Sequence, residues 1–313
     1  MKKNARIIVF LLCSLVLLTA CSKQVEEKDT HQKTTISNME NPADAIQFIS
    51  KAFQEFPILC LGKGAHASQA SHRFFKEMLL SNEIQNSVDV IIVEFANAEY
   101  QSDLDDYIFG RNISYDELRV MWRNTSLGAN TPLENPVYFA LLKLIRDVNL
   151  SRPLDKKIRV LVGDPPTDWG SVEENGVLIS RRNSYPSKLA VDQAFVKNKR
   201  VLILFGGAHL PKLQNNIKGK KAHMITTLIQ DKQPGPVLTI DFLRPADLGI
   251  SNRIDELEEG MIYQTNGHWI GEISAELFFP TIFFSDGSGK AVLYEGYQVK
   301  DIFDALIYIG PLY

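Results

Sequence analysis

Short apolar runs recur along the chain, and most of them end on a polar or ionisable residue. Their length and β-branched content are typical of buried strands. The predicted strands are 58–62, 90–94, 158–164, 201–205, 237–241 and a closing run at 305–309. Apolar residues at helical spacing lie between them, in the helices expected after Ser68, at 181–198 and at 222–230. This alternation predicts an α/β fold with a mostly parallel central sheet flanked by helices.

Residues 98–150, between the second and third of these strands, have a helical pattern instead. The last part of the segment carries Val137, Leu141 and Ile145 on one face. A helical insert of this size after the second strand would lie beside the strand ends. There it would serve as a lid or as a wall of a binding site.

The first residues have the pattern of a secretory signal. Lys2, Lys3 and Arg6 precede a largely apolar run at 7–18, which is short for a membrane-spanning helix. The sequence Leu18-Thr-Ala-Cys21 resembles the lipobox of bacterial lipoproteins, in which the cysteine is acylated, for example with palmitate. We therefore predict a signal peptide at 1–20 and a membrane anchor at Cys21; an uncleaved anchor helix is the alternative.

A mostly polar segment, 21–42, follows the cysteine and is predicted to be a flexible tether. The folded domain is predicted at 43–313, with Asn41-Pro42 capping its first helix. The expected location is the cell envelope, with the protein lipid-anchored. Because Ser22 rather than Asp follows the cysteine, a host with two membranes would place it on the periplasmic face of the outer membrane.

Composition narrows the function classes only a little. A formal net charge of −3 and 45% hydrophobic residues leave no basic patch, which argues against a nucleic-acid partner. A small-molecule substrate or ligand remains the expected partner. Cys60 lies inside an apolar strand, and a buried, inert thiol is the expected state there.

Ionisable residues gather at the predicted strand ends. They are His66, Glu94, Asp164, His209 and Asp241. In open α/β sheets, ligands bind outside the carboxyl ends of the strands, so these side chains are expected to face one cleft. The turn at 62–67 also fits the dinucleotide pattern G-x-G-x-x-A. A histidine in that turn would crowd a pyrophosphate, and a dinucleotide-binding protein is therefore kept as a weaker alternative.

The motifs Gly62-Lys-Gly-Ala-His66, Val93-Glu94, Gly163-Asp164 and Gly206-Gly-Ala-His209 resemble those of the erythromycin esterase family. That family belongs to a wider group with the ChaN-like haem-uptake lipoproteins and the Tiki proteases. The resemblance implies a site built on a histidine, a glutamate 28 residues later and a second histidine. These roles fall on His66, Glu94 and His209.

The sequence departs from the family pattern at three positions. The family glutamate of G-E-x-x-H is Lys63 here, and an additional histidine falls on Phe205. The arginine expected on the following helix is displaced, with Arg73 the nearest candidate and Phe75 in its place. The resemblance therefore implies a conserved site centre with altered surroundings, in which macrolide hydrolysis is doubtful.

The residues support hydrolysis of an ester or amide by activated water. His66 would take a proton from water, Glu94 would orient the imidazole, and Lys63 or His209 would stabilise the oxyanion. No G-x-S-x-G motif is present, so a covalent serine intermediate is not expected. Asp164, Arg73 and His268 are candidates for substrate contact.

Two further hypotheses use the same cleft. His66, Glu94 and His209 are nitrogen and oxygen donors that suit a divalent metal ion. Alternatively, a lipoprotein of the ChaN-like type would bind haem or another ligand there without turnover. The sequence leaves both open.

Overall fold

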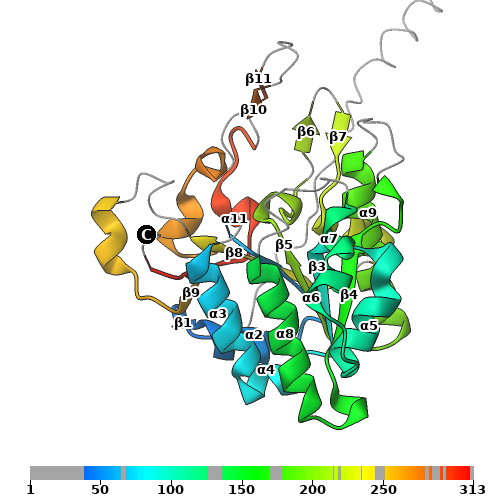
Figure 1. The fold of residues 1–313 in the computed structure, drawn as a ribbon. Helices are drawn as coiled ribbons and strands as arrows, with labels where there is room; N and C mark the ends of the chain where they lie inside the picture. The colour runs from blue at the N-terminus through cyan, green and yellow to red at the C-terminus, as the bar shows by residue number, and fades with distance from the viewer. Residues whose placement is uncertain are drawn as a thin grey trace, which may run out of the picture. The chain divides into compact units, whose positions relative to one another are not determined.

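The computed structural model describes residues 39–64, 68–125, 136–169, 178–213, 215–217, 220–233, 235–243, 251–278, 282–283, 290–291 and 294–310. Within them, eight strands form one sheet in the order β1-β9-β12-β8-β2-β5-β3-β4 (Figure 1). The predicted signal peptide, the lipidation site Cys21 and nearly all of the tether lie outside the described residues. Within these ranges, no helix combines the length and apolar character needed to cross a membrane.

The predicted strands form the parallel part of the sheet. They are β2 (Ile58–Gly62), β3 (Val90–Asn97), β4 (Arg159–Asp164), β5 (Val201–Phe205), β8 (Val237–Leu243) and β12 (Ala305–Tyr308). Nearly every residue in them is buried, because helices cover both faces and continuous apolar runs suit such strands. Their carboxyl ends therefore share one edge of the sheet. The predicted α/β class with a mostly parallel sheet is confirmed.

Two antiparallel strands extend the other side of the sheet and were not predicted. β9 (Met261–Gln264) pairs with β12, and β1 (Ala43–Asp44) pairs with β9. The prediction of a helix cap at Asn41-Pro42 is wrong. Helix α2 (Ala45–Ala52) is capped by Asp44, which accepts a hydrogen bond from Gln47 N, whereas the Asn41 amide bonds the backbone of Gln264.

The helices cover the two faces of the sheet in two groups (Figure 1). The first group is α2, α3 (Gln69–Leu80), α4 (Asn82–Ser87), α5 (Gln101–Phe109), α6 (Tyr115–Leu118), α7 (Val120–Arg123) and α8 (Pro136–Leu150). The second is α9 (Leu178–Val191), α10 (Ile225–Lys232) and α11 (Val299–Ile302). Helices α5 to α8 are the predicted insert, and α8 packs beside α3.

Local sequence explains where these helices begin. Ser68 caps α3 as predicted, with its hydroxyl accepting the Ser71 N–H at 3.3 Å. Helix α10 begins later than predicted, at Ile225, because 220–222 forms the short strand β7, which pairs with β6 (Asn215–Ile217). The small hairpin β10 (Ile282–Phe283) and β11 (Lys290–Ala291) lies outside the main sheet.

Candidate functional site

Glu94 is the centre of a buried charged cluster at the carboxyl edge of the sheet. It lies in β3, where the register with β4 shifts between Val93 and Asn97. Its side chain is 3% exposed. Oε2 accepts the Gly206 N–H at 2.7 Å and lies 3.1 Å from Lys63 Nζ, while Oε1 accepts from Arg182 at 3.0 Å. Both carboxylate oxygens are thus bound by positively charged groups.

These partners fix the ionisation state of the carboxylate. Burial would raise the pKa of Glu94, but the charges of Lys63, of the protonated form of His209 and of Arg182, with the Gly206 N–H, outweigh it and lower that pKa to about 2. Glu94 is therefore an anion at neutral pH and does not accept a proton there. Its chemical contribution is to hold cations and to stabilise positive charge on a neighbouring imidazole.

Lys63 connects the sheet edge to the helical insert. It follows β2, is 5% exposed, and its backbone N–H donates to the carbonyl of Phe205 at 2.9 Å. Beyond its ion pair with Glu94, Nζ donates to the Tyr138 hydroxyl at 3.1 Å and lies 4.8 Å from the centre of that ring. Tyr138 belongs to α8 and stacks on Phe95 of β3. The insert thus places a phenol at the edge of the cluster.

His209 has a defined orientation beside Glu94. The short 3₁₀ helix Gly207–His209 follows β5 and brings the imidazole to the strand edge. Its Nδ1 lies 2.7 Å from Asn183 Oδ1, and the Asn183 amide group donates to the carbonyl of His223 at 2.8 Å. Because that amide nitrogen is used as a donor, Oδ1 faces the imidazole and Nδ1 carries the proton. Nε2 then points to the carboxylate, 3.6 Å from Glu94 Oε1.

Arg182 was not among the predicted site residues. It lies on α9, is 13% exposed, and its guanidinium reaches Glu94 on one side and Asp164 Oδ1, at 3.6 Å, on the other. Asp164 is the last residue of β4, as predicted. A single arginine on a helix carries no motif, and the usual expectation for it is a solvated surface position. Only the packing of α9 against β3 and β4 reveals its place.

Asp241 is buried next to the glycines that precede the cluster residues. Its carboxylate lies where side chains at Gly62 and Gly207 would be, since a Cβ at either position would come within 1.8 or 1.9 Å of it. Oδ1 also accepts the Phe242 N–H at 2.8 Å. Gly62 therefore has a packing reason to be glycine that is independent of a phosphate, which removes one support for the dinucleotide alternative.

The remaining predicted residues lie elsewhere or outside the described ranges. Arg73 pairs with Glu259 at 2.7 Å, and both side chains are more than half exposed. His268 packs between Tyr263 and Trp269 next to β9, and its Nδ1 accepts the Ile270 N–H. Neither is brought into the cluster. His66 lies outside the described residues, so its predicted role stays a prediction.

The described part of the cluster does not fit a divalent metal ion. Within the described ranges, no group of three His, Cys, Asp or Glu side chains is placed to hold one. Moreover, Lys63 Nζ already lies 3.1 Å from one oxygen of the Glu94 carboxylate and the Arg182 guanidinium 3.0 Å from the other, and both cations would repel a metal ion bound there.

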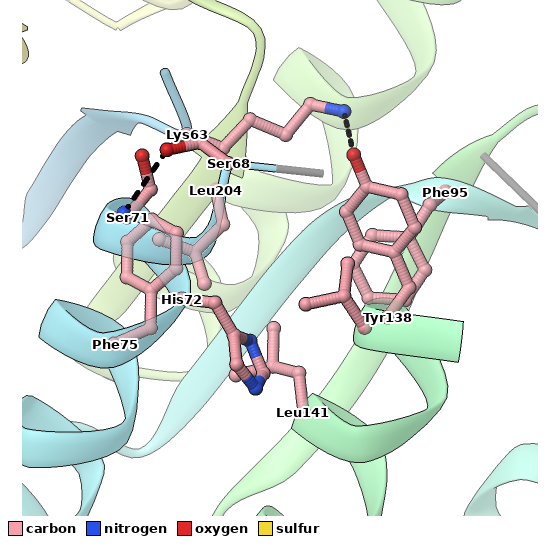
Figure 2. Close-up of a pocket in the computed structure, with 10 residues that line it drawn as sticks. Lys63, Ser68, Ser71, His72, Phe75, Phe95, Tyr138, Leu141 and Leu204 are labelled. Carbon is pink, nitrogen blue, oxygen red and sulfur yellow. Dashed lines mark hydrogen bonds between the residues drawn. The ribbon is translucent and has the colours of Figure 1, made fainter. Parts of the chain in front are cut away.

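A small cavity adjoins the cluster between α3 and α8 (Figure 2). Its volume is about 30 Å³, which is room for about two water molecules. It is lined by Lys63, Ser68, Ser71, His72, Phe75, Phe95, Val137, Tyr138, Leu141 and Leu204. Figure 2 shows the Lys63 side chain crossing from the side of Ser68 to the Tyr138 hydroxyl, so Lys63 borders both the cavity and the charged cluster.

Comparisons with known proteins find structures with a similar fold. No protein-family model matches the chain, and no curated protein matches its sequence. A succinoglycan biosynthesis protein has a similar structure, with a TM-score of 0.56 and 8% identity over 86% of this chain and 93% of that one. An erythromycin esterase mutant, EreC, in its open conformation gives a TM-score of 0.52 and 12% identity over 84% and 92%.

The haem-binding ChaN of Campylobacter jejuni is also similar, with a TM-score of 0.40 and 11% identity over 63% of this chain and 85% of that one. A TM-score this low carries no argument about function. At 8% and 12% identity, the succinoglycan biosynthesis protein and the esterase show a likeness of fold alone. The predicted resemblance to the erythromycin esterases is thus supported as a likeness of folds.

Proposed function

We propose that the protein is a hydrolase that cleaves an ester or amide bond by activating water at the charged cluster. The observation that carries the proposal is the orientation of His209. Asn183 fixes the proton on Nδ1, and Nε2 lies 3.6 Å from the ionised Glu94. An imidazole held in one tautomer beside a permanent anion can accept a proton and keep the resulting charge stabilised.

The other groups of the cluster suit the rest of such a reaction. As His209 takes a proton from water, the hydroxide formed would attack a carbonyl carbon. Lys63 and Arg182 would stabilise the negative charge that develops on the carbonyl oxygen, because their charges are buried and already oriented. His66 remains the second candidate for the base, and substitution of each histidine in turn distinguishes the two.

The test is turnover of a panel of 4-nitrophenyl esters by the purified protein and its variants. His209→Ala is expected to lower kcat by about 100-fold or more, as loss of a general base does, without changing the circular dichroism spectrum. His66→Ala is compared in parallel. His223→Ala is the matched control, because its side chain is half-exposed and only its backbone carbonyl contacts Asn183. Wild-type turnover by His209→Ala would refute the assignment.

A ligand-binding protein without turnover is the second candidate, and one observation favours it. Glu94 is fully engaged by Lys63, Arg182 and the Gly206 N–H, so the site has the character of a closed ion-pair network. Under this hypothesis, no ester of the panel is cleaved. A Soret shift on adding haem would identify haem as the ligand, and its absence would exclude haem.

We further propose that the domain is tethered to a membrane of the cell envelope through acylated Cys21. The support is the sequence alone, in the apolar run at 7–18 and the lipobox-like residues before the cysteine. Labelled palmitate should enter the wild-type protein but not Cys21→Ser. The variant should also leave the membrane fraction, since a single acyl chain or none anchors a protein poorly. Equal membrane retention of both proteins would contradict the proposal.

A further inference from the structure

The cavity between α3 and α8 begins where the charged cluster ends. Lys63 contributes to both, because Nζ contacts Glu94 in the cluster and the Tyr138 hydroxyl at the rim of the cavity. The Lys63 side chain alone would therefore lie between a molecule bound at the cluster and the cavity. No residue of the cavity other than Lys63 belongs to the ion-pair network described above.

The walls of the cavity are mainly apolar. Figure 2 shows Phe75 of α3, Phe95 of β3, Leu204 of β5 and Leu141 of α8 in the lining. Val137 of α8 also belongs to it. His72 adds no charge at neutral pH, because burial, with a further effect from Lys76, lowers the pKa of its imidazole. The charge of Lys63, the cation of the lining, is already paired with Glu94, so such a surface favours an uncharged group.

One polar group of the lining has no partner. The Ser71 hydroxyl is buried, in a residue that is 3% exposed, and forms no hydrogen bond within the described structure. By contrast, the neighbouring Ser68 hydroxyl already accepts the Ser71 N–H. A buried hydroxyl without a partner is costly, and a bound molecule with a polar atom would satisfy it.

We propose that this cavity is the subsite for a short, uncharged acyl chain that bears a hydroxyl group. The inference rests on the proposed hydrolase function and names its substrate class. A volume of about 30 Å³ admits a chain of about two or three heavy atoms, and longer chains would exceed this volume. The chain hydroxyl would bond Ser71, and the adjoining carbonyl would lie near Lys63.

The test compares esters of glycolic and propionic acid, whose acyl chains have the same size and differ by a hydroxyl in place of a methyl. Wild type should prefer the glycolate ester by about tenfold in kcat/KM, and Ser71→Ala should lose that preference. Kcat/KM should also fall for the hexanoate ester relative to the propionate ester.

Val137→Phe, which fills the cavity from a partly buried position, should lower kcat/KM for the propionate ester by about tenfold. Val120→Phe is the matched control, because Val120 is 42% exposed on α7.

A binding measurement keeps this inference separate from the proposed function. Saturation-transfer NMR with glycolamide and propionamide should show contact with wild type and loss of contact in Val137→Phe, whether or not any ester is hydrolysed. If esters are cleaved but neither Ser71→Ala nor Val137→Phe changes chain preference, the subsite is wrong and the hydrolase proposal stands. If no ester is cleaved, amide binding that Val137→Phe does not alter would overturn the subsite as well.

Discussion

Replacing Lys63 with methionine should destabilise the protein in a way that depends on pH. The substitution keeps most of the side-chain volume and removes the positive charge 3.1 Å from Glu94 Oε2. Arg182 and the Gly206 N–H remain, but burial of the carboxylate is then less compensated. Breaking one partner of a buried pair typically costs about 3–5 kcal/mol, since the other charge stays buried.

The pKa of Glu94 gives the size of the expected loss in unfolding free energy. Its pKa falls from 4.5 to about 2 on folding, and each pKa unit corresponds to about 1.36 kcal/mol, so the ionised carboxylate contributes on the order of 3 kcal/mol at neutral pH. Because the folded-state pKa is depressed, this contribution is present above pH 4.5. It is lost as the pH falls towards 2.

Urea denaturation followed by tryptophan fluorescence from pH 7 to pH 3 would measure both effects. Lys63→Met should lose about 3 kcal/mol of unfolding free energy at pH 7, and its difference from wild type should narrow below pH 4.5. Lys143→Met is the control, because Lys143 pairs with Asp147 on the surface, where exposed pairs contribute about 0–1 kcal/mol. A Lys63→Met loss below 1 kcal/mol, or one independent of pH, would refute the reasoning.

Three further outcomes follow from single contacts. Asn183→Ala removes the acceptor of His209 Nδ1, so ¹⁵N NMR of the imidazole should show more of the Nε2–H tautomer, and an unchanged tautomer ratio would contradict the assigned orientation. Gly207→Ala should cost about 1–3 kcal/mol of unfolding free energy, because its Cβ would lie 1.9 Å from Asp241 Oδ2. The double variant with Asp241→Ala should cost less than the sum of the two single changes, and additivity would exclude the clash. Cys60 should react with Ellman's reagent at pH 8 only after unfolding, because burial raises the pKa of its thiol to about 12; rapid labelling of the native protein would show that the strand opens.

The parallel strands could be predicted because the signal for each is local. An apolar run such as 201–205 is buried on both faces, and its composition alone distinguishes it from the helices around it. Strand order is not local, and the sequence does not indicate that β5 lies between β2 and β3. Strand β9 was missed for a related reason: it is short, only its middle residues are buried, and its partner β12 lies far along the chain.

The same distinction holds for the candidate site. Strand-end reasoning brought Glu94, Asp164 and His209 to one edge of the sheet, because parallel strands share their carboxyl ends. Strand-end reasoning could not identify Arg182 or Tyr138, because both residues lie on helices. The spacing of apolar residues in a helix indicates only which of its faces is buried. Their roles depend on how α9 and α8 pack on the sheet, and that is a property of the assembled fold.

Lys63 changes the electrostatic balance expected from the esterase motif. With glutamate at that position, a third carboxylate would join Glu94 and Asp164, Arg182 would be the cation left in contact with them, and one of the three carboxylates would tend to bind a proton. With lysine, the contacting groups Lys63 and Arg182 balance Glu94 and Asp164, and Glu94 is held as an anion. In the proposed hydrolysis the base is then His209, whose Nδ1 lies 2.7 Å from Asn183 Oδ1. A reaction that starts with an uncharged substrate and develops a negative oxygen suits such a balance, because two oriented cations are present and the imidazole can carry the proton.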